Sequence, residues 1–473
     1  MKKSLIISKV LFAALSLILI ASPAEARKKT DGPKAPKYVF YFIGDGMGIN
    51  EAFGAQLYNR ATGNGPEDIN FLQFPVRTFV TTVSANSLVT DSSAAGTALA
   101  TGTKINNNGM GRTPDGKDVY SICVDAHAKG FGTGIATTVG LNHATPAAFY
   151  AHSESRNDYE AIAKQLVEAD FIDFAAGGGF NNEKKKTGHD SDYLESLFPA
   201  AGIPVLKSKE EFGRIADVKT RVLCLDNKPG EEIALSIDQK PGDICLADFV
   251  DAGIKYLDAK FGEKGFLFMV EGGLIDHAGH GDDAAADFVE VNDMAKAIDV
   301  VLAFYELHPD ETLIVVTADH ETGGLMLGAG QYAMEPGLLA CQHEGEDAIN
   351  AKFTALESPS WEEVKAFLSD NLGLWTKVRV SSRQEATFKE MYDQVYGGSD
   401  ADGGQVVSLY GVSNKIVSEA IDYLDRQAGI MMPHGVHTGS PVGVYVKGAV
   451  AYEFIAVRDN TDLPKLIKKL AQY

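Results

Sequence analysis

The segment from Glu271 to His280 constrains this chain most, because it places ionisable side chains directly after an apolar run. Residues 264–270 have the composition of a buried strand. Glu271, Asp276, His277 and His280 follow within ten residues, and the carboxyl end of a strand is where open α/β proteins bind ligands. Asp276 and His280 are spaced i, i+4, so one helical turn can direct both toward a common ion. The alternative is a polar loop with solvated charges.

Strand-like runs recur along the chain, and each is followed by a glycine- and aspartate-rich turn and then by a helical pattern. The helical spacing of apolar residues is clearest between Phe288 and Tyr305. This alternation predicts an α/β fold, a three-layer α/β/α sandwich around a largely parallel sheet with surface insertions. The strand-like runs are residues 38–43, 132–139, 265–270, 312–316 and 442–446.

The N-terminus has the pattern of an export signal. Two lysines precede an apolar stretch over residues 10–21, and residues 24–26 match a small-x-small cleavage site. We expect residues 1–26 to be a cleaved signal peptide and the protein to be periplasmic or secreted. No stretch approaches the length that a membrane helix needs, so no membrane anchor is expected.

Residues 27–473 are expected to form one domain. Within it, residues 181–262 and 331–432 interrupt the alternation of strands and helices, and we interpret both as elaborated regions. The first is charged and rich in turns. The second contains helical patterns and is predicted to be an insertion that either caps the site or forms a subunit interface.

The acidic composition limits the partners. The chain carries a formal net charge of −21 at pH 7, so neither nucleic acid nor an anionic membrane is an expected partner. An anionic substrate would also be repelled at long range. Any phosphate site therefore needs local positive charge, such as metal ions.

The chain has four cysteines, and none has the C-x-x-C spacing of a zinc or redox site. In an exported protein they could form two disulfides, with three possible pairings. Cys224 and Cys245 are the closest in sequence. The other two are Cys123 and Cys341.

Two further motifs place reactive side chains at the ends of predicted elements. Asp45 follows the first strand-like run within a Gly-Asp-Gly turn, where it either points toward a ligand or bonds its own backbone. Asp91 and Ser92 begin an alanine-rich helix that Gly102 would end. Either residue could be only the N-cap, or Ser92 could be a nucleophile at the positive end of the helix. Because no Gly-x-Ser-x-Gly elbow is present, activation by a metal is favoured over a hydrolase triad.

Aspartate and histidine recur in two later motifs. Asp319 and His320 follow a strand-like run, and His437 lies in a glycine turn near the C-terminus. An isolated histidine is more often structural, but repeated Asp/His groups at strand ends or glycine turns indicate a metal centre. Oxygen and nitrogen ligands without thiolates suit zinc or magnesium. Their number exceeds what one tetrahedral ion needs and predicts a two-metal site for a displacement reaction.

Taken in order, these motifs resemble those of the alkaline phosphatase family across most of the chain. Asp91-Ser92, preceded by Val-Thr, resembles the nucleophile motif of that family. The segment from His143 to Arg156 resembles its threonine and arginine segment. The remaining metal motifs are matched by Glu271, Asp276 and His280, by Asp319-His320, and by His437-Thr-Gly.

The resemblance implies an exported phosphomonoesterase with two zinc ions, a third ion that is usually magnesium, and a phosphoserine intermediate on Ser92. Arg156 would bind the substrate phosphate as a bidentate donor; a surface ion pair is its alternative role. The implied ligands are Asp276, His280 and His437 for one zinc, Asp45, Asp319, His320 and the Ser92 oxygen for the other, and Asp45, Thr145 and Glu271 for the third ion.

His143 and His277 fall at positions where family members vary, some of them carrying Asp and Lys. Imidazoles beside the third site could change which metal it prefers, so the identity of that ion stays open. His152 and His434 lie near the motifs and are predicted to be structural.

Three alternatives are weighed against the phosphomonoesterase. A phosphodiesterase or nucleotide pyrophosphatase of the same superfamily would share the two-zinc core but would not need Thr145 and Glu271. A sulfatase is disfavoured because Ser92 is not followed by the Pro and Arg of the sequence read for formylglycine formation. A non-catalytic metal- or phosphate-binding protein would not require Ser92. The expected substrates are small phosphate monoesters; the sequence determines neither the natural substrate nor whether the protein is a homodimer.

Overall fold

The computed structural model describes residues 34–473 apart from 229, 329, 331 and 398–403, so the predicted signal peptide lies outside the described residues. Its centre is a nine-stranded sheet of order β2-β15-β8-β1-β7-β3-β4-β6-β5. β1 pairs in parallel with both β7 and β8, whereas β15, near one edge, is antiparallel to both of its neighbours, β8 and β2. The strands are β1 (Tyr38–Gly44), β2 (Val76–Val80), β3 (Gly132–Thr137), β4 (Phe174–Gly177), β5 (Val205–Leu206), β6 (Val222–Leu225), β7 (Phe266–Gly272), β8 (Thr312–Ala318) and β15 (Val442–Gly448).

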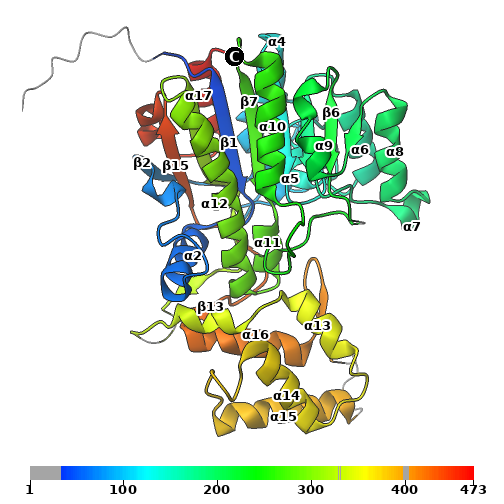
Figure 1. Ribbon diagram of the computed structural model, residues 1–473, viewed down its shortest axis with the longest axis vertical. Coiled ribbons are helices and arrows are strands. Elements are labelled where there is room, and N and C mark those ends of the chain that lie inside the picture. The colour runs from blue at the N-terminus through cyan, green and yellow to red at the C-terminus, as the bar shows by residue number, and fades with distance from the viewer. Residues whose placement is uncertain (1–33, 229, 329, 331, 398–403) are drawn as a thin grey trace, which may run out of the picture. The chain divides into compact units, whose positions relative to one another are not determined.

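Helices cover both faces of the sheet, which confirms the predicted three-layer α/β sandwich (Figure 1). On one face, α10 packs against β3, β4 and β7, and α12 packs against β1 and β7. On the other face, α4 and α5 pack against β3 and β7, and α3 packs on α5. The helices are α3 (Ser92–Thr101), α4 (Ile122–Ala128), α5 (Ala144–Ala147), α10 (Leu246–Phe261) and α12 (Ala284–Leu307).

The central strands are apolar on both sides because they are covered on both faces. All seven residues of β1, β7 and β8 are buried, as expected for parallel strands between two helical layers. The register aligns their carboxyl ends, with Gly44 of β1 opposite Gly272 of β7 and Ala318 of β8. The residues that follow these strands are therefore brought to one edge of the sheet.

The five strands expected from the sequence are all present in the central sheet, which also contains four short strands that the sequence does not predict. β4, β5 and β6 extend the sheet on one side and β2 closes the other. Strands of two to five residues carry too few positions to show a period of their own. β5 and β6 lie inside residues 181–262, so part of that elaborated region belongs to the central sheet.

Within residues 331–432, the part that the structure describes forms a helical cap at the carboxyl edge of the sheet (Figure 1). Its helices pack mainly on α16, and a short hairpin of β11 and β12 precedes that helix. The cap elements are η3 (Pro336–Cys341), α13 (Glu346–Thr354), α14 (Trp361–Leu372), α15 (Ser382–Tyr396), β11 (Gln405–Val407), β12 (Val412–Asn414) and α16 (Lys415–Ala428).

The four cysteines are free thiols, so the two disulfides considered from the sequence do not form in this structure. The thiols are enclosed separately: Cys123 is buried in α4, Cys224 is buried in β6, and Cys341 ends η3. Cys245 donates to Asp248 of its own helix. Burial raises the pKa of Cys123 to about 12, which suppresses the thiolate needed for oxidation.

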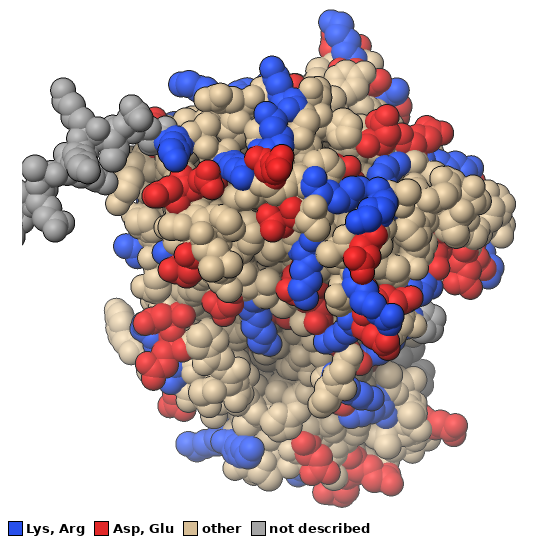
Figure 2. Space-filling model, turned by 45° about the horizontal axis from the view of Figure 1, so that its top comes forward, with Lys and Arg blue, Asp and Glu red and all other residues tan. Residues whose placement is uncertain are grey.

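Charged side chains of both signs are interspersed over the face in Figure 2. Within the part of the chain that the structure describes, no helix has both the length and the apolar character to cross a membrane.

A buried carboxyl on α12 gives the fold a testable pH dependence. Burial, with the nearby Asp293 carboxylate, raises the pKa of Glu290 to about 8. From about pH 4.3 to about pH 8 the folded state therefore holds a proton that the unfolded chain has released, so stability falls as pH rises through this range. Replacing Glu290 by glutamine, which keeps an acceptor for the Ser236 amide, is expected to raise the free energy of unfolding at about pH 9 by up to about 5 kcal/mol.

Urea titrations at about pH 5 and about pH 9 measure this effect, because the gain should be much smaller at the lower pH. Glu306→Gln, an exposed change on the same helix, is the control. Equal stabilisation by Glu290→Gln at both pH values would rule out a raised pKa as the cause.

Candidate active site and metal centre

The aligned strand ends bring the predicted ligands together. Asp45 follows β1, Asp319 follows β8, and Glu271 is the penultimate residue of β7. All three are fully buried. Gly46 adopts a φ of 74°, and a Cβ there would lie 2.8 Å from the Asp276 Cα. Only glycine therefore lets this turn approach the helix that carries Asp276.

Two histidines face each other across the first ligand set. The Nε2 atoms of His280 and His437 are 3.1 Å apart. The Nδ1 of His280 lies 2.8 Å from the Gly435 carbonyl oxygen, and the Nδ1 of His437 lies 2.9 Å from that of Thr90. A carbonyl oxygen can only accept, so each Nδ1 carries the proton and each Nε2 keeps a lone pair. Two facing lone pairs call for a cation between them.

Asp276 completes this set. It lies on α11 (Leu274–His280), with one carboxylate oxygen 3.4 Å from the His280 Nε2 and the other 3.6 Å from the His437 Nε2. Ligands at the usual zinc distances around a tetrahedral ion lie about 3.3 Å from one another. Burial and the neighbouring His320 lower the pKa of His437 to about 4, which keeps this imidazole in the neutral form that binds metal.

The second ligand set is built around His320. Its Nε2 lies 3.0 Å from an Asp319 oxygen, 3.4 Å from Asp45 Oδ1 and 3.1 Å from the Ser92 hydroxyl. These separations again match the edges of a zinc coordination tetrahedron, about 3.3 Å. Asp45, Asp319 and His320 have ligand atoms close enough to hold one ion. The same is true of Asp276, His320 and His437, so His320 stands between the two sets.

Ser92 is the first residue of α3, and it is fully buried. The N-cap is its neighbour Asp91, whose side chain accepts from the Ala94 amide and from the Ser93 hydroxyl. Asp91 therefore caps the helix, and the Ser92 hydroxyl points toward the second ligand set. The helix N-terminus favours negative charge at this oxygen.

The third set joins Asp45, Glu271 and two residues at the start of α5. The Thr145 hydroxyl donates to Asp45 at 3.0 Å, and the Thr137 hydroxyl donates to Glu271 across the β3–β7 pairing. His143 also has a ring nitrogen close enough to share an ion with Asp45 and Glu271.

Several carboxylate oxygens of these three sets have no hydrogen-bond partner, which indicates that the residues could hold cations. Asp45 Oδ1, Asp319 Oδ2 and Glu271 Oε1 are buried and accept no hydrogen bond. Burial raises the pKa of Asp45 well above its usual value, with a further contribution from Asp319, and burial raises that of Glu271 to about 8. Buried carboxylates without partners are costly unless they are protonated or coordinate metal.

Thr322 orients residues of both the first and the second ligand set. It belongs to β9 (Glu321–Thr322), which pairs with β14 (His437–Thr438) and so places Thr322 beside His437. Its hydroxyl donates to Asp276 at 2.6 Å and lies 3.2 Å from the His320 Nδ1. Because the hydroxyl proton points to Asp276, the oxygen accepts from the His320 Nδ1–H, which leaves the Nε2 of His320 for a metal.

Replacing Thr322 by valine is expected to weaken zinc binding by about 10- to 100-fold, because two ligands lose their orienting partner. Thr322→Ser keeps the hydroxyl and should retain most of the affinity. Competition with a zinc chelator measures both variants, and circular dichroism checks that each is folded. If the valine and serine variants bind zinc equally well, this hydroxyl does not orient the ligands.

Arg156, the predicted phosphate-binding residue, lies beside the candidate metal ligands. Its guanidinium is 3.2 Å from the His143 Nε2 and 3.8 Å from an Asp91 oxygen. Only 15% of the side chain is exposed. Arg156 and His143 line a cavity of about 680 Å³.

Tyr410 is a site residue that the sequence analysis missed. It occupies the turn between β11 and β12 of the cap. Its hydroxyl donates to Asp276 at 3.4 Å and lies 3.3 Å from the His143 Nε2. The ring stacks on His277 at 3.7 Å between centroids, and the Nδ1 of His277 pairs with Glu232 at 2.8 Å. His277 therefore contacts the cap and Glu232, whereas His143 lies among the third-site ligands.

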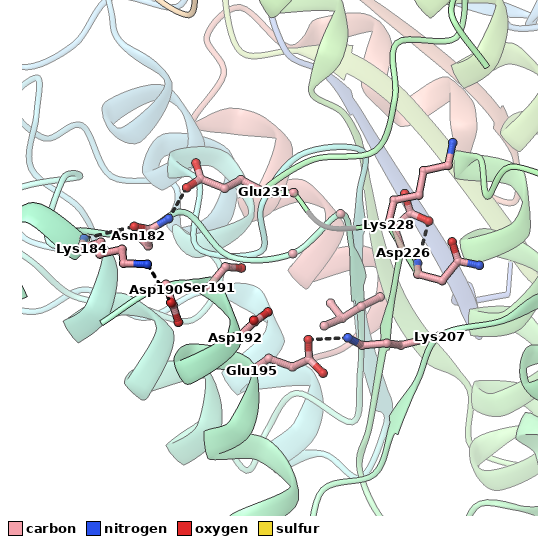
Figure 3. Close-up of a pocket in the computed structure, with 15 residues that line it drawn as sticks. Asn182, Lys184, Asp190, Ser191, Asp192, Glu195, Lys207, Asp226, Lys228 and Glu231 are labelled. Atoms are coloured by element: carbon pink, nitrogen blue, oxygen red, sulfur yellow. Dashed lines mark hydrogen bonds and ion pairs between the residues drawn. The ribbon is translucent and has the colours of Figure 1, made fainter. Parts of the chain in front are cut away.

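A second cavity, of about 550 Å³, lies at the carboxyl ends of β4 and β6 (Figure 3). Its three lysines are paired with carboxylates: Lys184 with Asp190 at 3.1 Å, Lys207 with Glu195 at 2.6 Å and Lys228 with Asp243 at 2.5 Å. None of the predicted metal ligands lines it. The same is true of the cavity that contains Arg156, but Tyr410 on its wall contacts Asp276, and His143 lies close to Asp45 and Glu271. The Arg156 cavity is therefore the one that adjoins the candidate site, and the two cavities share Gly230 and Glu231.

Comparison with known proteins agrees with this geometry. Residues 36–473 match the family model of alkaline phosphatase. Alkaline phosphatase 4 of Bacillus subtilis is 30% identical over 91% of this chain and 88% of its own length. The cold-active alkaline phosphatase of a Shewanella species superposes with a TM-score of 0.75 at 30% identity, covering 92% of this chain and 99% of that one. The Thermus thermophilus alkaline phosphatase gives a TM-score of 0.75 at 28% identity, covering 93% and 92%.

A nine-stranded α/β sandwich with buried Asp/His sets at its carboxyl edge defines a metal-dependent hydrolase. The chain belongs to the alkaline phosphatase family, whose members are metal-dependent phosphomonoesterases.

Proposed function

We propose that this protein is an exported alkaline phosphatase that hydrolyses small phosphate monoesters through a phosphoserine intermediate on Ser92. The observation that carries the proposal is the His320 cluster. In this cluster the Ser92 hydroxyl, an Asp45 oxygen and an Asp319 oxygen all lie 3.0 to 3.4 Å from the Nε2 of His320. A non-catalytic binding protein would not need a hydroxyl in this position.

The proposed metal ligands are those of the three sets. Asp276, His280 and His437 would hold one zinc, and Asp45, Asp319, His320 and Ser92 the other. The two ions would supply Lewis acidity at the attacking and leaving oxygens and the positive charge that this acidic chain lacks. Arg156 would bind and orient the phosphate through its planar fork of donors.

Ser92 would act as the nucleophile from the N-terminus of α3. Its oxygen attacks phosphorus, the bond to the alcohol breaks, and water later hydrolyses the phosphoserine. The helix dipole favours negative charge on this oxygen in both steps. Burial of Ser92 and its neighbours excludes bulk water and strengthens these electrostatic effects.

For the third site we propose magnesium held by Asp45, Thr145 and Glu271, an all-oxygen set that suits a hard cation. His143 would be a neighbour of the ion. Arg156 can only donate, so its contact with the His143 Nε2 favours the tautomer with the proton on Nδ1. With the proton on Nδ1 and the Nε2 lone pair taken by Arg156, neither ring nitrogen is free to coordinate a metal.

The proposal is tested by comparing hydrolysis of an aryl phosphate monoester and the matching diester, before and after chelation and with zinc added back. We expect the monoester to be preferred, activity to be lost on chelation, and zinc to restore it. Preference for the diester would assign the protein to the phosphodiesterases of the superfamily instead. Monoesterase activity that survives complete metal removal would exclude the proposed site.

Export and assembly are separate parts of the proposal. Residues 1–26 would direct export to the periplasm or the medium, which N-terminal sequencing of the native protein tests; a mature chain that keeps these residues would exclude a cleaved signal. Light scattering of the purified protein distinguishes a monomer from the homodimer.

A further inference from the structure

The cavity beside Arg156 has a wall that is distinct from the metal centre. It is about 680 Å³ in volume, which exceeds what a phosphate group alone would fill. On the proposed function, the alcohol part of a phosphate monoester would occupy the remaining space. The chemistry of this wall therefore indicates which alcohols the site accepts. Besides Arg156 and His143, the wall includes Tyr159, Glu231, Glu232, His277, Leu409 and Tyr410.

One part of this wall is an aromatic surface. His277 stacks on the Tyr410 ring with an interplanar angle of 28°, so that face of the ring is covered. Tyr410 is nevertheless 38% exposed, and it lines the cavity together with Tyr159 and Leu409. A tyrosine ring held in place by a stacked imidazole offers its free surface to a cation or to an apolar group.

A second part of the wall is acidic. The Glu231 carboxylate is held by the side-chain amides of Asn181 and Asn182, at 2.9 and 2.6 Å. These donors fix the carboxylate without neutralising its charge. Glu232 pairs with His277 but remains 45% exposed. Two carboxylates thus face the space that the alcohol would enter.

The described residues that line this cavity include no lysine, and their one arginine is Arg156, which the phosphate would occupy. A second anionic group on the substrate would therefore meet Glu231 and Glu232 without a free cation to pair with it. An ammonium group would meet carboxylates and an aromatic surface, the combination that recognises quaternary ammonium ions.

We propose that this cavity selects phosphate monoesters of ammonium-bearing alcohols over those whose alcohol carries a second anionic group. The inference rests on the proposed phosphomonoesterase function and adds a substrate class to it. Tyr410 and the Glu231/Glu232 pair are the residues that set the selectivity.

The test compares kcat/KM for three monoesters that differ in the charge of the alcohol: phosphocholine, its uncharged isostere 3,3-dimethylbutyl phosphate, and phosphoglycolate. We expect the order cationic, neutral, anionic, with phosphocholine at least about fivefold above its isostere. Because choline is also the better leaving group, the decisive quantity is how the ratio of phosphocholine to isostere changes between wild type and variants.

Four variants locate the selectivity. Tyr410→Ala and the double variant Glu231→Gln/Glu232→Gln should each lower that ratio at least about threefold. Tyr410→Phe keeps the ring and should preserve the ratio. Glu306→Gln, at the far end of α12, is the matched control for loss of a carboxylate and should change nothing. If Tyr410→Ala does not fold, the glutamate variant and Tyr410→Phe still decide the question.

Failure of this inference is distinguishable from failure of the proposed function. Loss of hydrolysis of every monoester, including an aryl phosphate, would overturn the function. Good hydrolysis of the aryl phosphate, with the same ratio in wild type, Tyr410→Ala and the glutamate variant, would overturn the substrate class alone. Preference for phosphoglycolate over the isostere in the wild type would also overturn it.

Discussion

Replacing Ser92 by alanine is expected to lower kcat/KM for an aryl phosphate by at least about 10⁴-fold. The reason is that Ser92 supplies the proposed nucleophile, and among the described residues no other hydroxyl lies against the Nε2 of His320. The change removes one buried oxygen at the first turn of α3, and the N-cap Asp91 is unaffected. Steady-state kinetics, with zinc content measured on the same sample, separates loss of the nucleophile from loss of the metals.

Ser93→Ala is the matched control. Ser93 is the next residue of the same helix, equally buried, and its hydroxyl donates to Asp91. Losing that bond should cost activity by less than about fivefold. Full activity of Ser92→Ala, or equal losses in the two variants, would contradict the assignment of Ser92.

Replacing His437 by alanine is expected to remove zinc from the first ligand set and to lower kcat/KM by at least about 100-fold, more than the loss of an orienting group. His437 is the ligand contributed from the far C-terminus. Its Nε2 closes the set against the Nε2 of His280, 3.1 Å away. Elemental analysis should find less zinc per chain than in the wild type.

His434→Ala controls for the loss of an imidazole in the same loop. His434 lies three residues earlier and its side chain is exposed, so zinc content and activity should stay at wild-type values. Wild-type zinc content in His437→Ala would show that another residue completes the first set.

The sheet and most of the site could be predicted because both follow from local patterns. Apolar runs such as residues 266–272 form strands that are buried on both faces, and that burial produces an uninterrupted hydrophobic sequence. Parallel strands then bring the residues that follow them to one edge of the sheet. Asp45 and Asp319 therefore meet there, although they are 274 positions apart in the sequence.

What could not be predicted depends on packing between distant segments. Tyr410 reaches Asp276 from a hairpin in the cap, and nothing in the sequence around it indicates a site residue. The free cysteines are another case, because pairing depends on whether the fold brings thiols together. Thr322 lies in the Asp319 motif and could have been found there, since ligand histidines commonly have an orienting partner.

Identification of the phosphorylated residue tests the central claim most directly. The enzyme is mixed with a phosphate monoester, quenched in acid during turnover, digested, and analysed by mass spectrometry. We expect a phosphate on Ser92 in the peptide that contains Asp91 and Ser93, and its absence from the Ser92→Ala variant. Phosphate on a different residue, or turnover of the monoester with no phosphorylated enzyme at any quench time, would contradict a phosphoserine intermediate at Ser92.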